Sequence, residues 1–150
     1  MTKIKEDDDI RDGFFNDLFK KYKKNKKIYF LTADQGAFIL KDLIKHDRKR
    51  VINVGISEQL LVSFASGLSG SGNIVYIYAI SSFLIFRAFE QIKVDLILNK
   101  SNVKIIGMGT GFCYSQDGPT HHSLEDISVL RPYLNDINIY TPSNSISSSL

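Results

Sequence analysis

The sequence predicts an α/β protein, a three-layer fold in which a parallel sheet is flanked by helices on both faces. Two observations lead to this class. The apolar runs predicted as strands are continuous rather than alternating, as expected for strands that are covered on both sides. Segments with helical periodicity separate these runs along the chain, as they do in connected β-α-β units. In such sheets, ligands bind beyond the carboxyl ends of the strands.

Composition is that of one globular domain: 150 residues, 43% hydrophobic and 23% charged. The net charge of +3 comes mostly from residues 20–27, at the end of a predicted helix, so it does not indicate a nucleic-acid partner. Cys113 is the single cysteine, which excludes an internal disulfide. Residues 1–9 are too polar for a signal peptide, and no apolar run reaches the ~20 residues of a membrane span. We therefore expect a cytoplasmic protein with no membrane partner.

The first half of the chain alternates helical and extended patterns. A helix is predicted over Glu6–Lys24, because acids gather at its start, lysines at its end, and one face is apolar at a spacing of four. Apolar runs and apolar periodicity then predict the following elements: strand Ile28–Thr32, helix Phe38–His46, strand Val51–Val54 and helix Ser57–Leu68.

The second half continues the alternation. Ser81 or Ser82 is expected to cap its first helix. Residues 109–122 are rich in Gly, Ser and Thr and are predicted to form a loop. The other predicted elements are strand Ile74–Ile80, helix Phe83–Leu98, strand Val103–Met108, helix Ser123–Leu130, a fifth strand Ile137–Tyr140, and a helix that starts near Pro142. We place an N-terminal helix and lead-in over residues 1–26, and the α/β domain over residues 27–150, truncated at its C-terminal end.

Glu58 lies where a predicted strand passes into an apolar helix. Charged groups seldom enter such helices unless they are paired or functional. The alternative is a first-turn acid that is favoured by the helix dipole. Asp34 follows another strand, so both carboxylates belong to the expected ligand-binding edge.

Aromatic and histidine residues are expected at the same edge. Phe83, Phe86 and Phe89 recur every third residue, a row that is usually core, but Phe83 lies at the mouth of its helix. The adjacent His121 and His122 follow an acid in the long loop. Adjacent side chains diverge and no third ligand occurs at a usual spacing, so we predict no metal site on this chain.

Three ordered motifs resemble the pyrimidine-binding domain of transketolase-like enzymes. They are residues 55–59 (GISEQ), residues 81–83 with 87–91 (SSF and RAFEQ), and residues 117–121 (DGPTH). The resemblance covers about Lys27 to Asn144. Similar domains occur in 1-deoxyxylulose-5-phosphate synthase and in beta subunits of 2-oxoacid dehydrogenases, and the DGPTH loop favours the first of these and transketolase.

The resemblance implies a thiamine diphosphate-dependent enzyme that transfers a two-carbon ketol unit between sugars. It implies that Glu58 hydrogen-bonds the pyrimidine ring of the cofactor and activates it. Phe83 and Phe86 match positions that pack on this ring, whereas Phe89 is assigned to packing within the domain. Asp34 matches an acid near the cofactor and the dimer interface.

The long loop matches residues that face the sugar. Asp117 and His121 correspond to groups that contact the donor, and His121 is a candidate for proton transfer. His122 stands where glutamine is common and is placed on the substrate side. Gly109 and Thr141 replace residues that hold the substrate phosphate in sugar-phosphate transketolases, and Gln116 replaces a common glutamate. These differences predict an unphosphorylated or modified sugar.

The diphosphate end of the cofactor needs a second domain. Enzymes of this family bind it and Mg²⁺ through a Gly-Asp-Gly motif, which this sequence lacks. We therefore expect a split enzyme, with Mg²⁺ on a partner domain or subunit, assembled as a homodimer or a heterotetramer. The start at Met1 resembles a natural N-terminus. The alternatives are a beta-type subunit of a 2-oxoacid dehydrogenase and a non-catalytic interaction module.

Overall fold

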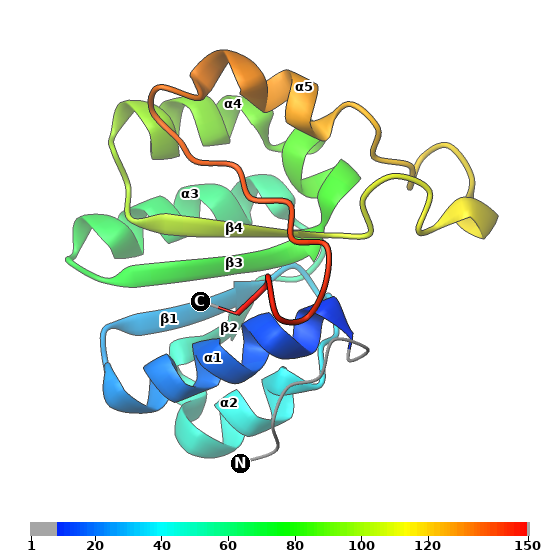
Figure 1. Ribbon diagram of the computed structural model, residues 1–150. Helices are drawn as coiled ribbons and strands as arrows, with labels where there is room; N and C mark the ends of the chain where they lie inside the picture. Colours follow the sequence, from blue (N-terminus) through cyan, green and yellow to red (C-terminus); the bar gives the residue numbers. More distant parts are fainter. Residues whose placement is uncertain (1–8, 150) are drawn as a thin grey trace.

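The computed structural model describes residues 9–149. Its strands and helices alternate as the sequence predicts (Figure 1). In chain order the elements are α1 (Ile10–Lys24), β1 (Ile28–Thr32), α2 (Ile39–Asp47), η1 (Arg48–Arg50), β2 (Val51–Asn53), α3 (Glu58–Gly70), β3 (Ile74–Ile80), η2 (Phe83–Arg87), α4 (Phe89–Gln91), η3 (Ile92–Leu98), β4 (Val103–Met108), η4 (Ser115–Asp117), α5 (Asp126–Leu130) and η5 (Arg131–Tyr133).

The four strands form one parallel sheet in the order β2-β1-β3-β4. Phe30 of β1 pairs with Val51 on one side and with Tyr76 on the other. The chain therefore moves outward from β1 to β2 and then returns to the opposite side of β1 to form β3. Such a reversal is a topological switch point, and it leaves a crevice at the carboxyl ends of the two central strands.

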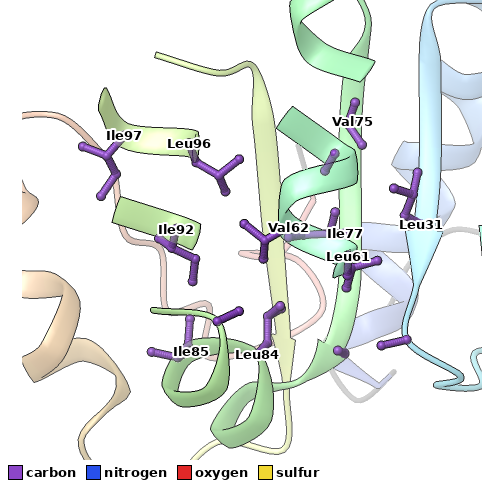
Figure 2. Close-up of a cluster of buried hydrophobic side chains, with 14 residues drawn as sticks. Leu31, Leu61, Val62, Val75, Ile77, Leu84, Ile85, Ile92, Leu96 and Ile97 are labelled. Carbon is purple, nitrogen blue, oxygen red and sulfur yellow. The ribbon is translucent and has the colours of Figure 1, made fainter. Parts of the chain in front are cut away.

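Helices cover both faces of the sheet, which confirms the predicted three-layer class (Figure 1). One core lies between the sheet and α1 with α2, and it contains Phe30 and Tyr78. The second core lies against α3 and the η2–α4–η3 helix, and it contains Leu31 and Ile77 (Figure 2). Alternate residues of β1 and β3 thus point to opposite cores, and both sets are apolar. The domain boundary placed at residue 26 stays a prediction.

Strand limits agree closely with the sequence. β1, β3 and β4 have the predicted bounds, and β2 ends one residue early, at Asn53. Residues 6–8 of the first predicted helix lie outside the described residues, and the described part begins at Ile10 after an N-cap, Asp9, that accepts a hydrogen bond from the Arg11 N–H.

The predicted fifth strand is wrong. Residues 137–140 pair with none of the described strands, and Tyr140 is 82% exposed. Ile137 packs on the second core without any ladder. Ile137 is half-buried there, which accounts for part of the apolar pattern that suggested a strand. The helix expected near Pro142 is instead a turn in which the Ser148 N–H donates to the Asn144 carbonyl at 3.1 Å.

The helix predicted over Phe83–Leu98 is irregular. η2 and η3 are wide π-type helices separated by the short α4, and Ala88 between them has φ −109° and ψ 21°. Ser81 and Ser82 do not cap it, because their hydroxyls reach the Asp126 carboxylate at 2.8 Å and the Thr120 carbonyl at 3.4 Å. The helix predicted from Ser123 begins later, at Asp126. Wide turns are frequent near functional sites, and η2 begins just after the carboxyl end of β3, beside the switch point.

Candidate functional site at the switch point

Glu58 opens α3 directly beyond the carboxyl end of β2. The turn before it contains Gly55 at φ +76°, a conformation that side chains rarely adopt. The Gly55 N–H donates to the Asn53 side-chain oxygen at 2.9 Å, which fixes this turn. Only 6% of the Glu58 side chain is exposed. A short strand and a tight turn therefore place one carboxylate inside the protein, at the edge of the sheet where ligands bind.

Asp34 is held by the same asparagine. The Asp34 N–H donates to the Asn53 side-chain oxygen, and the Asn53 amide donates back to the Asp34 carboxylate, both at 2.9 Å. Asp34 has φ 58°, which is a strained backbone for a residue other than glycine. Its side chain is exposed at the rim of the crevice. Asn53 therefore links the turns after β1 and β2, a role that sequence reasoning did not identify.

A cavity of about 100 Å³ lies at the switch point. Asp34, Glu58 and Phe83 all line it, together with apolar side chains. The structure therefore brings together three of the predicted site residues, from three separate segments. This volume is below the roughly 300–1,000 Å³ of typical small-molecule sites, so the cavity can enclose only part of a ligand. The other lining residues are Ala33, Gln35, Ile56 and Ile80.

Arg87 is the site residue that sequence reasoning missed. Its guanidinium lies 3.3 Å from a Glu58 carboxylate oxygen and 3.8 Å from the centre of the Phe83 ring. Half of the side chain is exposed, at 49%. A signal was available, because residues 59–86 contain no Asp, Glu, Lys or Arg, so Arg87 is the first charged residue after Glu58.

The long loop brings one of its two histidines against Phe83, a residue that lines the cavity. The His121 and Phe83 rings form a T-shaped pair with ring centres 4.8 Å apart, and the His121 Nδ1 lies 3.0 Å from the Thr120 hydroxyl. A bridge between Gly111 and Ser123 closes the base of this loop. His121 therefore reaches the site through the aromatic residue at the mouth of η2.

The other predicted residues lie further out. Asp117 is exposed at the end of η4, and Phe86 is exposed on η2 without lining the cavity. His122 instead packs against Phe112, with ring centres 4.9 Å apart. Its Nε2 is buried and has no hydrogen-bond partner among the described residues. The isolated chain therefore forms the part of the site around Glu58 and leaves these three outside it.

Gly109 lies under the Tyr114 ring. A Cβ at this position would fall 2.0 Å from a ring carbon of Tyr114, and Gly109 has φ +73°. Burial raises the pKa of the Tyr114 phenol above its usual range. The Tyr114 ring also lies 6.0 Å from the His121 ring. The Tyr114 ring therefore occupies the space into which a side chain at position 109 would project.

Neither a metal cluster nor a membrane span is found in the described part of the chain. No three His, Cys, Asp or Glu side chains converge there in the way that a metal ion requires. No helix among residues 9–149 combines the length and the apolar character needed to cross a membrane.

Fold and site together define a parallel α/β domain with a carboxylate and an aromatic ring at its switch point. Comparison with known proteins gives the family: the chain belongs to the transketolase pyrimidine-binding domain family, which it matches over residues 6–148. This result confirms the family that the three sequence motifs indicate.

Relatives of this chain include components of several transketolases. It is 38% identical over 124 residues to one of the subunits of apulose-4-phosphate transketolase from Phocaeicola vulgatus, a match that covers 82% of this chain and 40% of that protein. It is 28% identical over 137 residues to a 6-deoxy-6-sulfo-D-fructose transketolase subunit from a Clostridium species, covering 91% of this chain and 42% of that protein. The chain thus spans about two fifths of the length of these relatives.

A solved structure has the same fold. It is described as a split gene transketolase in an inactive beta4 tetramer, and it superposes with a TM-score of 0.75 at 29% identity. The match covers 93% of this chain and 44% of the other. A domain of this fold therefore occurs in a transketolase whose gene is split.

Proposed function

We propose that this chain is the pyrimidine-binding part of a thiamine diphosphate-dependent transketolase, which transfers a two-carbon ketol unit between sugars. The observation that carries the proposal is the burial of Glu58 beside Phe83, in a cavity at the switch point. A structural first-turn acid would lie in solvent, whereas this one faces a cavity whose walls are otherwise mostly apolar. The family of the chain supports the same reading.

The residues of the cavity fit one end of the proposed cofactor. A flat heterocycle needs an aromatic or apolar wall and one hydrogen-bonding group, which Phe83 and Glu58 offer. When bound, thiamine diphosphate supplies a carbon nucleophile that accepts the ketol unit. Glu58 would share a hydrogen bond with a nitrogen of the pyrimidine ring and exchange a proton with it. Phe83 would orient the ring, and Asp34 would lie at the rim.

The sugar would approach from the side of the long loop. His121 packs against Phe83 in a T-shaped ring pair, and it would act as a proton donor or acceptor toward the donor sugar. Asp117, His122 and Phe86 would join the site only when a partner repositions the loop and covers the outer surface of η2. Their roles rest on the family motifs.

A partner would complete the site. The sequence has no Gly-Asp-Gly motif, and relatives of this chain are named as subunits of transketolases. We therefore propose that a second domain or chain binds the diphosphate and Mg²⁺, in a homodimer or a heterotetramer. A cytoplasmic location follows from the proposed sugar metabolism.

The substrate would be a sugar outside the common pentose phosphates. The Tyr114 ring fills the space beside Gly109, where a longer phosphate-binding side chain would clash. One relative acts on apulose 4-phosphate and another on a sulfo-sugar, according to their names. A modified sugar donor is therefore proposed. Rapid turnover of xylulose 5-phosphate by the assembled enzyme would contradict this choice.

The function is tested by mixing this chain with a candidate partner chain that carries the Gly-Asp-Gly motif, together with thiamine diphosphate, Mg²⁺ and a panel of sugars. We expect ketol transfer that depends on all components. Glu58→Gln should lower it by about 10²- to 10⁴-fold, because the proton exchange is lost. Glu90→Gln is the matched control, since Glu90 is exposed on α4 and lies outside the cavity.

Equal rates for Glu58→Gln, Glu58→Ala and the wild type would reject the proposed role of Glu58. Transfer to a lipoyl acceptor in place of a sugar would favour a 2-oxoacid dehydrogenase component. Tight assembly without any cofactor-dependent chemistry would favour an interaction module.

A further inference from the structure

We propose that Arg87 is a positioning residue that holds Glu58 and Phe83 in place from outside the switch-point cavity. The inference rests on the proposed function, because it assigns a task to a neighbour of the two proposed cofactor-binding side chains. It concerns contacts within this chain, so it can be tested separately from catalysis.

Two contacts join the Arg87 guanidinium to both residues at once. Its Nη1 donates to Glu58 Oε2 at 3.3 Å, and its central carbon lies 3.8 Å above the Phe83 ring centre. A planar guanidinium can bond a carboxylate through its edge while its face stacks on an aromatic ring, which an ammonium group does less well. One side chain therefore restrains a hydrogen-bonding group and a stacking surface together.

Arg87 approaches from the side away from the cavity. Glu58 and Phe83 line the switch-point cavity, and Arg87 does not. Arg87 lines a neighbouring, more open hollow, together with Glu58 and Gln59. Glu58 thus stands between the two spaces, with the cation on the outer side. A carboxylate has more acceptor sites than one donor can fill, so Oε1 can still accept a hydrogen bond from a ligand in the cavity.

The backbone of Arg87 is anchored as well. The Gln59 side-chain amide donates to the Arg87 carbonyl at 3.0 Å. This carbonyl lies at the end of η2, where Ala88 departs from helical dihedrals. The first turn of α3 and the end of η2 are therefore joined twice, once through side chains and once through the main chain. The irregular helix gives Arg87 the fixed base that a positioning residue needs.

The first test uses the chain without cofactor, and it measures side-chain rotamers by NMR couplings at Glu58 and Phe83. The wild type should show one χ1 rotamer for each. Arg87→Met should leave both averaging between rotamers, with an unchanged backbone spectrum. Arg87→Lys should keep Glu58 ordered but release Phe83, because the charge remains and the planar stacking is lost. Lys93→Met removes a charge from an exposed site on η3 and serves as the control.

Single rotamers at both residues in Arg87→Met would overturn the proposal, whatever the enzyme catalyses. If Arg87→Met does not fold, the Arg87→Lys variant decides: single rotamers at both Glu58 and Phe83 overturn the proposal, and averaging at Phe83 alone supports it.

The second test uses the assembled enzyme. Arg87→Met should raise the concentration of thiamine diphosphate needed for half-maximal rate by about tenfold, with partial rescue in Arg87→Lys. An unchanged value in Arg87→Met would also overturn the proposal. A wild-type assembly without cofactor-dependent transfer would instead reject the proposed function, and the rotamer measurement would still decide on Arg87.

Discussion

Two arginines make the same pair of contacts on opposite faces of the sheet, with opposite burial. Arg50 bonds the Asp47 carboxylate at 2.7 Å and stacks 3.8 Å above the Tyr22 ring. Arg87 bonds Glu58 at 3.3 Å and also stacks on a ring at 3.8 Å. The buried partner is the cation in the first pair, with Arg50 and Asp47 side chains 6% and 35% exposed. In the second pair the buried partner is the Glu58 carboxylate, whose side chain is 6% exposed.

Hydrogen-bond saturation separates the two. Nη1 of Arg50 donates to three carbonyls, those of Tyr22, Asn25 and Ile28, at 3.0–3.2 Å. These bonds join the end of α1 to the start of β1, so Nε and Nη1 of Arg50 are both used within the fold. Glu58 has one long contact to a half-exposed arginine. A buried group with spare hydrogen-bonding capacity indicates a ligand site, and one that makes several hydrogen bonds within the fold indicates a structural role.

Removal of each arginine should give the largest contrast. Arg50→Met leaves buried carbonyls without their donor, so we expect the free energy of unfolding to fall by about 2–4 kcal/mol. Arg87→Met breaks a partly solvated pair and should change it by less than about 1 kcal/mol. Urea denaturation followed by circular dichroism measures both. A similar loss for the two variants would show that the Glu58 pair is structural too.

The next contrast concerns glycines on the two faces, where each single change is expected to be smaller than the loss at Arg50. A Cβ at Gly13 of α1 would fall 1.9 Å from the Ser145 carbonyl oxygen, so Gly13→Ala must displace the segment around Ser145. We expect a loss of about 1–3 kcal/mol. A Cβ at Gly67 of α3 would meet no atom of another segment within 4 Å, and Gly67→Ala should stabilise the helix by about 0.5–1 kcal/mol. Thermal melts of both variants test the pair, and a destabilised Gly67→Ala would reveal an unseen constraint on α3.

The last prediction concerns the loss of folding stability at alkaline pH through the buried Tyr22 phenol. Burial raises the pKa of Tyr22 to about 12, against about 10 for an unfolded phenol. The folded state therefore holds this proton more tightly, so the contribution to stability is complete below about pH 10 and is lost as the pH rises toward 12. Stability curves should fall less steeply over this interval in Tyr22→Phe. Equal slopes in the two proteins would contradict the effect.

Local patterns predicted most of the fold correctly, and they failed where long-range contacts decide. β1, β3 and β4 coincide with runs of β-forming residues, because strand bounds follow from short stretches of sequence. Residues 137–140 had the same apolar pattern but found no neighbouring strand. Ser81 was expected to cap a helix, and its hydroxyl instead meets Asp126, 45 positions later. A local pattern of residue types cannot indicate which distant residue a side chain will contact.

The sequence by itself determined the layered α/β class, the place of Glu58 at the start of α3, and the family to which the chain belongs. Each of these depends on residue types at short spacing, which local propensity and ordered motifs record. Only the tertiary structure decided that Asp34, Glu58 and Phe83 share one cavity and that Arg87 contacts two of them. Glu58 and Arg87 are 29 positions apart, and β3 lies between them in the chain. The return of β3 to the far side of β1 brings them together, because parallel pairing fixes where distant strand ends meet.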